Sequence, residues 1–485
     1  MPRGGALVES VSPSQQFQAI FNRQPDKLEI LVTHRKQRLE VQFNRQLFPI
    51  SRVVDHRQLV LRPLRAQCIL YLMLPLDCGQ EFDPARDEEF FAALPARSGV
   101  LLIEMTEQGA QPYLARTADL RRAAERLLRA PDAPTKRLNL REVAARIRYR
   151  LTGSKFEQTL ALYEQARQHF PRRYRDFLRL RTPAVLKVNL RNEYPRCYVT
   201  RSIRADGGFY FGPFSSRRAA DAFAEGFLDL FKIRRCQIKI RRDPKFPGCI
   251  YSEMKMCLAP CFAGCTEQEY DTEAARVVET LDTSGAALIE RIEHDREAAS
   301  EALDFERAAG LHKRLEKVSA ALRGLPEIAR RIEDLNAVIL ERTAEDMTIA
   351  VFPVRAGILA EPIFLRFAEL SSQPRSVEAI LRNELEPATA TPQQNSPAQP
   401  NPDTPAANAS SAAPPADWRA QYALRAAPPD LAEHLALVAR WFYSKPRTGE
   451  IFFNDNGWPY RRILRACGRL LGPVQQTQFG SQPEG

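Results

Sequence analysis

The chain of 485 residues is long enough for three or four domains of about 100–200 residues each. Its 70 lysines and arginines exceed its 59 aspartates and glutamates, and the net charge of +11 suits a polyanionic partner without deciding the fold. No apolar run approaches the ~20 residues that cross a bilayer, so we expect no membrane partner, and the longest run, residues 68–76, predicts a buried strand. Because the N-terminus has no apolar signal region, we expect a cytoplasmic protein.

The first half of the chain predicts three segments. Residues 1–80 are β-rich and of unknown role, with strands over 28–34, 38–43 and 57–64. Residues 81–180 combine strands over 99–105 and 112–116 with two helices, one capped by Asp119 and one that stops at Pro171. Residues 181–270 carry short strands, a helix over 217–231 and a cluster of cysteines.

The second half is helical first and mixed afterwards. Residues 271–335 predict charged helices with an apolar stripe. Residues 336–386 and 417–472 predict a small α/β unit with strands near its start and an amphipathic helix over 431–443. Between them, residues 387–416 are rich in proline and almost uncharged, which predicts a disordered linker, and residues 473–485 predict a disordered tail. The fold class expected is therefore α+β and multidomain.

Four of the nine cysteines lie within seventeen residues, which is typical of a metal or iron–sulfur site in a reducing compartment. The run reads Cys249, Cys257, Cys261 and Cys265, with Cys236 upstream. No histidine lies near it, so an all-thiolate site is favoured over a Cys2His2 zinc site. Thiolates suit zinc and iron–sulfur clusters alike, and several free thiols in a compact loop remain the alternative.

The order and spacing of these motifs resemble the UvrC family of excinucleases. The resemblance rests on the segment from RTPAVLKVNLRNEYPRCYVTRS through the YFGPF motif to the helix that ends in RRC, and on the run CIYSEMKMCLAPC. It implies a [4Fe–4S] cluster with a structural role, with zinc as the alternative, held by Cys236, Cys249, Cys257 and Cys261. Cys265 lies outside the family pattern, as a bystander or an alternate ligand.

Upstream, the stretch from FFAALPARSGVLLIEM to ADLRRAAERLL resembles the GIY-YIG nuclease domain of the family, in a degenerate form. The resemblance implies residual, inactive catalytic positions at Tyr113, Arg116 and Arg122. The family's catalytic arginine falls on Ala123 and its metal-binding glutamate near Leu162, with Glu157 and Glu164 the closest acids. Two positions on a helix turn a side chain by about 200°, so Glu164 is expected to face away from the site. The alternative is that Arg122 and Glu164 restore it.

Residues 301–318 resemble the UVR motif, a helical hairpin that in this family docks onto UvrB. The resemblance implies a partner-binding set made of Leu303, Phe305, Glu306, Ala309, Leu311 and Leu315. The alternative is an ordinary amphipathic helix that packs within its own chain. DNA backbone contacts are expected from arginine-rich surfaces, in particular from Arg121, Arg126, Arg172 and Arg173.

The sequence thus predicts a UvrC-like, DNA- and UvrB-associated protein of nucleotide excision repair whose GIY-YIG site is inactive. The family's C-terminal RNase H-like nuclease and helix-hairpin-helix motifs are not expected in this chain. One alternative is a Mg²⁺- or Mn²⁺-dependent endonuclease that cuts near lesions through a non-standard GIY-YIG site. Another is a metal-stapled module that stacks single-stranded nucleic acid on exposed aromatic side chains at Tyr210, Phe211 and Phe214.

Overall fold

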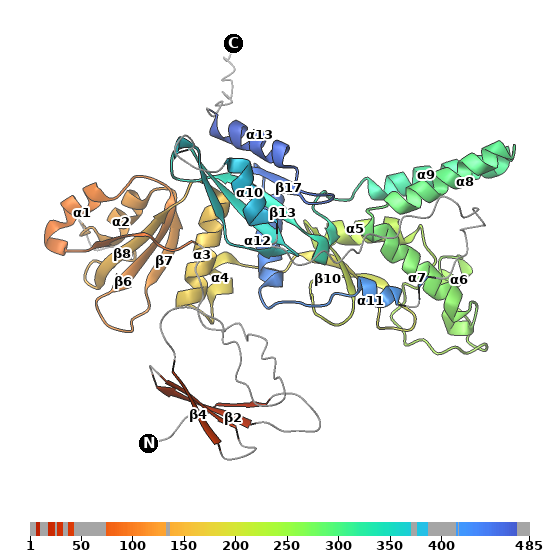
Figure 1. Cartoon of the computed structure of the whole chain (residues 1–485), viewed down its shortest axis with the longest axis horizontal. Coiled ribbons are helices and arrows are strands. Elements are labelled where there is room, and N and C mark those ends of the chain that lie inside the picture. The colour runs from red at the N-terminus through yellow and green to blue at the C-terminus, as the bar shows by residue number, and fades with distance from the viewer. Residues whose placement is uncertain are drawn as a thin grey trace, which may run out of the picture. The chain divides into compact units, whose positions relative to one another are not determined.

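The computed structural model (Figure 1) describes residues 74–131, 136–369, 376–386, 414–415 and 417–472, together with the backbone of four strands before residue 43. Contacts divide the chain into two units, Met1–Tyr71 and Leu72–Gly485. The described part mixes helices with four separate sheets, which confirms the α+β class. None of the helices within the described residues is long and apolar enough to cross a membrane.

The first unit contains one antiparallel sheet in the order β1-β2-β3-β4. Its strands are Ala6–Glu9, Gln18–Gln24, Lys27–Val32 and Gln37–Gln42. The strands predicted over 28–34 and 38–43 are confirmed as β3 and β4. The strand predicted over 57–64 lies outside the described residues.

The second unit begins with an antiparallel sheet in the order β5-β8-β6-β7. These strands are Cys78–Glu81, Ala144–Leu151, Gly99–Met105 and Tyr113–Thr117. Helices α1 (Asp87–Ala93) and α2 (Leu120–Leu128) pack on one face, and α3 (Lys155–His169) packs on the other. Asp119 caps α2 by accepting the Arg122 N–H at 3.0 Å, as the sequence predicts, and α3 ends just before Pro171.

The strand predicted over 68–76 is not found in its described part. Leu74 and Leu76 are buried, but they lie in irregular chain that leads into β5. Both side chains pack into the core beside α3, and this segment forms no hydrogen-bonded strand pair. Burial alone therefore explains why the segment is apolar. Residues 68–73 lie outside the described part, and β5 itself spans the boundary expected at residue 80.

The middle of the chain forms a second antiparallel sheet in the order β10-β9-β11-β12. Its strands are Cys197–Thr200, Ala184–Val188, Phe209–Phe214 and Arg330–Arg331. Helices α5 (Arg217–Leu228) and α7 (Glu267–Asp282) share its core, and the short α6 (Ile250–Glu253) lies in the cysteine loop. The helix α4 (Tyr174–Leu178) precedes the sheet.

Two long helices, α8 (Ala286–Glu301) and α9 (Phe305–Leu322), follow and lie side by side as a hairpin (Figure 1). Only three residues separate them, which forces an antiparallel arrangement. The helices predicted for residues 271–335 are confirmed in this form. The base of the hairpin packs on the core around α5, while its tip reaches away from that core.

The last sheet has the order β15-β14-β13-β17, with β16 also paired to β14. Its strands are Ile358–Leu359, Thr348–Arg355, Ala337–Arg342, Glu450–Phe453 and Ile363–Arg366. Helices α10 (Val377–Leu385) and α13 (Tyr460–Leu471) cover one face. Helix α12 (Leu431–Phe442) shares the core of the other face with α3, and α11 (Trp418–Tyr422) packs on α7. Most of the predicted linker, 387–416, lies outside the described residues.

Helix α3 is shared by two sheets. It is buried from Phe156 through Ala166, and it belongs to one core with β6, β7, β13 and β14. Phe156 meets Phe352 edge to face, with ring centroids 5.0 Å apart, and lies 5.9 Å from the ring of Trp441. A helix enclosed on all sides must satisfy or neutralise every polar group that it carries.

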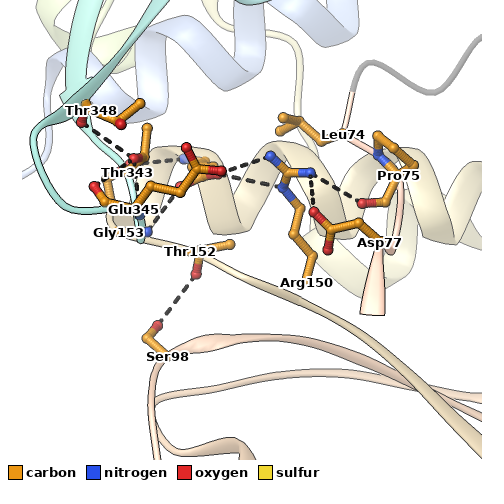
Figure 2. A network of polar contacts seen from close by, with 12 residues as sticks. Leu74, Pro75, Asp77, Ser98, Arg150, Thr152, Gly153, Thr343, Glu345 and Thr348 are labelled. Atoms are coloured by element: carbon orange, nitrogen blue, oxygen red, sulfur yellow. Dashed lines mark hydrogen bonds and ion pairs between the residues drawn. The ribbon is translucent and has the colours of Figure 1, made fainter. Parts of the chain in front are cut away.

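A polar network ties the start of α3 to β8 and to the chain before β5 (Figure 2). Glu157 accepts a hydrogen bond from the Gly153 N–H at 2.9 Å and pairs with the Arg150 guanidinium at 3.4 Å. Arg150 also donates to the Pro75 carbonyl at 3.2 Å and to Asp77 at 3.3 Å. Burial nevertheless raises the pKa of Glu157, against the opposing effects of the Gly153 N–H and Arg150. The turn between β8 and α3 is therefore fixed by a buried ion pair.

Gly153 in this turn touches the backbone of Thr343, which belongs to the β13–β14 connection. A Cβ added at Gly153 would lie 2.1 Å from the carbonyl carbon of Thr343, so Gly153→Ala must displace one of the two backbones. We expect this variant to lose about 1–3 kcal/mol of unfolding free energy, or to be insoluble. Urea-induced unfolding measures this loss of free energy. Gly226→Ala is the control, because its Cβ meets nothing within 4 Å in α5 and should stabilise by about 0.5–1 kcal/mol. Equal stability of the two variants would contradict the close approach.

Glu341 is a buried carboxyl group at the end of β13, and no cation within the described residues forms an ion pair with it. It accepts hydrogen bonds from Trp441 Nε1 at 2.6 Å and Thr448 Oγ1 at 3.1 Å, and burial raises its pKa from 4.5 to about 7. A raised carboxyl pKa favours the folded state below pH 4.5, and that contribution is lost as the pH rises through 7. Glu341→Gln should therefore stabilise the protein at pH 8 by up to about 3 kcal/mol and change little at pH 4.5.

Thermal unfolding across this pH range measures the effect. The exposed Glu361 provides the control, and Glu361→Gln should leave the pH profile of the wild type in place. A Glu341→Gln variant that follows the wild-type profile would show that Glu341 ionises as readily in the folded protein as in the unfolded chain.

Candidate functional site

The three residual nuclease positions are divided between two faces of one sheet. Tyr113 pairs with Ile103 across β6 and β7, and both pack toward α1 and α2. Arg116 pairs with Val100, whose side chain lies in the core beside α3. Because side chains alternate along a strand, Tyr113 and Arg116 point to opposite faces. The structure therefore does not bring them together.

Helix α2 places the third position, Arg122, on its exposed side. Its backbone N–H is used by the Asp119 cap, and its side chain faces solvent. Ala123, which stands where the family has its catalytic arginine, is 5% exposed and packs in the core between α1 and α2. An arginine at this position would need to be buried without a partner, which is why alanine fits here.

On α3, the positions expected to carry a metal-binding acid are all inside the protein. Leu162 packs in the shared core at 5% exposure. Glu164 is buried and accepts the Leu74 N–H at 2.8 Å, and Glu157 is the carboxylate of the Arg150 pair. Neither acid reaches the face that carries Arg122. Among the described residues, the structure thus provides no carboxylate grouped with Tyr113, Arg116 and Arg122.

The four cysteines implied by the resemblance lie in one loop region around α6 and the turn Pro260–Phe262. Burial, together with the nearby Cys236, Cys249 and Cys261, raises the pKa of the Cys257 thiol to about 11. The pKa of the Cys261 thiol is likewise raised by burial and by the nearby Cys249 and Cys236. The four thiols are therefore close enough to influence one another's ionisation.

Cys265 has a different environment. It is buried in the core with Tyr270 and α5, and of the four other cysteines only Cys261 affects its pKa. The backbone carbonyl of Cys265 accepts a hydrogen bond from Arg242 at 2.9 Å. Cys265 therefore packs in the core just before α7, apart from the group of four cysteines.

The donor chemistry of the four cysteines fits a thiolate-bound metal. No three cysteine, histidine or acidic side chains in the described part of the chain stand close enough to hold an ion as they are. The loop nevertheless turns sharply on either side of Cys261 through left-handed residues Ala259 and Ala263. The Ala259 N–H already donates to Cys257 Sγ at 3.3 Å, the kind of contact that stabilises a thiolate. Thiols with raised pKa values need a cation to ionise near neutral pH.

The hairpin of α8 and α9 divides the residues of the predicted docking set into two groups. Leu303 is 72% exposed and Phe305 is 67% exposed at the tip, and Glu306 and Ala309 are exposed beside them. Leu311 and Leu315 are half-buried and pack on the core shared with α5. The tip therefore offers an uncovered apolar surface, while the two leucines nearer the base are used within the chain.

The arginines predicted to contact DNA also have different environments. Arg121 donates to the carbonyls of Leu94 at 2.8 Å and Ala92 at 3.1 Å, so its guanidinium group holds the end of α1. Arg126, Arg172 and Arg173 are exposed. The sequence does not show that α1 ends beneath Arg121, and DNA contact by these arginines stays a prediction.

The aromatic side chains proposed for base stacking are inside the protein. Tyr210, Phe211 and Phe214 are at most 2% exposed on β11. Phe211 and Phe214 pack in the core with α5, and the Tyr210 hydroxyl donates to Asp206 at 3.0 Å. A module that stacks bases on these rings is therefore excluded.

Sequence reasoning missed a basic hollow next to α12, where Arg179, Arg181, Arg201 and Arg440 meet. These arginines come from three separate parts of the chain, and no spacing in the sequence connects them. Arg179 and Arg181 follow the predicted run at Arg172 by only a few residues, which is the one available signal.

One family model and several curated proteins match parts of the chain. Residues 184–280 match the family model of the UvrC/Cho excinuclease middle domain. The UvrABC system protein C of Moorella thermoacetica is 27% identical over 297 residues, which cover 61% of this chain and 48% of that protein. Those of Dehalococcoides mccartyi and Oleidesulfovibrio alaskensis are 26% and 29% identical, over 55% and 57% of this chain and 44% and 39% of theirs. The matched stretch thus spans less than half of these relatives. No solved structure matches the chain.

Replacing one cysteine of the group of four should remove bound metal. We expect Cys257→Ser, purified without oxygen, to lose most of its iron or zinc and to unfold more readily in urea, because a structural metal contributes directly to folding. Elemental analysis and the visible absorption of the protein measure the result. Cys467→Ser is the matched control, since Cys467 is a buried thiol in a different core. Unchanged metal content in Cys257→Ser would rule out Cys257 as a ligand.

Proposed function

Because this chain belongs to the UvrC family, we propose that it acts in nucleotide excision repair as a non-incising factor that associates with DNA and docks onto UvrB. The observation that carries the proposal is the hairpin tip, where Leu303 and Phe305 are exposed side by side at the end of two long helices. An isolated chain gains nothing from keeping two large apolar side chains in water, whereas a partner can cover them.

The separation of the residual nuclease positions supports the non-incising part of the proposal. A metal-dependent cut needs a carboxylate to hold the ion and a cation to stabilise the charge that develops on phosphorus. Tyr113 and Arg116 lie on opposite faces, and Leu162 occupies the core where an acid would be required. Glu157 cannot move to serve the purpose, because releasing it would leave Arg150 without its buried partner.

The cysteine group supports a structural role for a bound metal. A [4Fe–4S] cluster or zinc would be held by Cys236, Cys249, Cys257 and Cys261. The bound metal would cross-link a loop region. That loop contains little regular structure of its own apart from α6 and the turn at Pro260–Phe262. It lies between α5 and α7, so closing it would fix the approach of α7 to the middle sheet.

An incision assay with a docking readout tests the proposal. The protein would be combined with UvrA, UvrB, ATP and Mg²⁺ or Mn²⁺ on an end-labelled duplex that carries one bulky adduct, with an active UvrC as the positive control. We expect no cut and a slower-migrating UvrB–DNA complex. A cut on the 3′ side of the adduct would instead show a working non-standard site. Absence of both cutting and complex formation would contradict the repair function.

Substitutions at the hairpin tip distinguish specific docking onto UvrB from nonspecific hydrophobic binding. The double variant Leu303→Ser, Phe305→Ser should weaken UvrB binding by at least tenfold, since each buried apolar side chain contributes about 1.5–3 kcal/mol. Leu138→Ser is the control, because Leu138 is also an exposed leucine, 55% accessible, but lies far along the chain from the hairpin. Equal binding by both variants would exclude the tip as the docking surface.

A further inference from the structure

A hollow of about 310 Å³ lies where α12 meets the middle sheet and the chain after α4. Its charged lining consists of Arg179, Arg181, Arg201 and Arg440, and none of the described residues that line it is an aspartate or glutamate. Four residues with hydroxyl groups complete the polar lining, namely Thr182, Ser215, Ser216 and Tyr443. A concave surface with four guanidinium groups and hydroxyl donors is rich in donors and therefore selects an anion.

The arginines of the hollow are not used elsewhere in the described structure. No ion pair joins any of the four to a described carboxylate, and the Arg440 guanidinium donates only to the carbonyl of Arg179, at 3.0 Å. Arginines a short distance away behave differently. Arg167 pairs with Asp430 at 2.8 Å and Arg175 pairs with Glu433 at 2.7 Å, so the acids at the start of α12 are already occupied.

The positive charge continues beyond the hollow. Partial burial, together with the nearby charge of Arg116, lowers the pKa of Arg440 below its usual value. Arg116 lies on the face of β7 turned toward α3, and its charge reaches Arg440 although Arg116 does not itself line the hollow. Cations held together without acids repel one another, and an anion that binds between them relieves that repulsion.

We propose that this hollow binds the phosphodiester backbone of a nucleic acid. A strand is favoured over a single phosphate ion because the four guanidinium groups carry more positive charge than one phosphate can balance. Phe214 is buried in the wall of the hollow, and Tyr443 lines it with its hydroxyl donating to the Pro213 carbonyl at 2.9 Å. The inference rests on the proposed function and deepens it, since it assigns the DNA contact to residues other than those the sequence suggested.

The test compares oligonucleotide binding by the full chain and its variants. Arg201→Ala removes a side chain that makes no hydrogen bond within the described structure, so folding should be unaffected, and Arg440→Ala is the second variant. Fluorescence anisotropy with a labelled oligonucleotide, single-stranded and duplex, should show affinity falling by about tenfold in each variant. The slope of log K against log salt should fall by about one per arginine. Arg323→Ala is the control, because it removes the same charge from an exposed position at the end of α9.

Each outcome has a separate meaning. Weaker binding in both hollow variants, with normal binding in Arg323→Ala, supports the inference. Oligonucleotide binding that is unchanged in Arg201→Ala and Arg440→Ala overturns the inference and leaves the proposed function standing. Inorganic phosphate or AMP that competes at the same phosphate concentration as the oligonucleotide overturns it in favour of a small-anion site. No oligonucleotide binding by the wild type overturns both the inference and the DNA association.

Discussion

The buried pair of Arg150 and Glu157 is the constraint on which the second unit depends. It fixes the turn at Gly153, and this turn sets where α3 starts and how closely the chain approaches Thr343. A buried pair of this kind adds little net stability compared with apolar packing, but removing one partner costs about 3–5 kcal/mol because the other is left charged in the core. Its contribution is therefore to geometry, since it allows only one position for α3 between two sheets.

The position of α3 decides what chemistry its residues can perform. A helix enclosed by β6 and β7 on one side and by β13 and β14 on the other has no face left for substrate. Its acids are consumed by internal contacts, Glu157 with Arg150 and Glu164 with the Leu74 N–H. At the far end, Tyr163 donates to Glu433 of α12 at 2.6 Å, so both ends of α3 are tied by carboxylates. The helix that could carry a metal-binding acid therefore serves here to pack between two sheets.

The sequence predicted those elements whose pattern is local. Strand Gly99–Met105 and helices α2, α3 and α12 follow from apolar periodicity, the Asp119 cap and Pro171, and all are found within a residue or two. The cysteine loop was predicted from the spacing of its cysteines, whereas the hairpin was expected only from the resemblance to the UVR motif. What failed depends on contacts between distant segments. Leu74 and Leu76 gave a strand-like pattern because they are buried against α3. Similarly, no residue near Arg121 in the sequence indicates that its side chain donates to carbonyl groups at the end of α1.

The same limit explains why the basic hollow escaped prediction, and it gives a way to interpret the net charge. An arginine becomes structural when a carbonyl or a carboxylate from another segment lies within its reach, as for Arg121, Arg150 and Arg175. Composition counts these residues as if they were available to a ligand. The charge that can act on a polyanion is only what remains after such pairing. That remainder includes the surface formed by Arg179, Arg181, Arg201 and Arg440, where pairing has left several cations together and no acid among them. Local concentration of unpaired charge, and not the total, determines where a phosphate backbone gains most from binding.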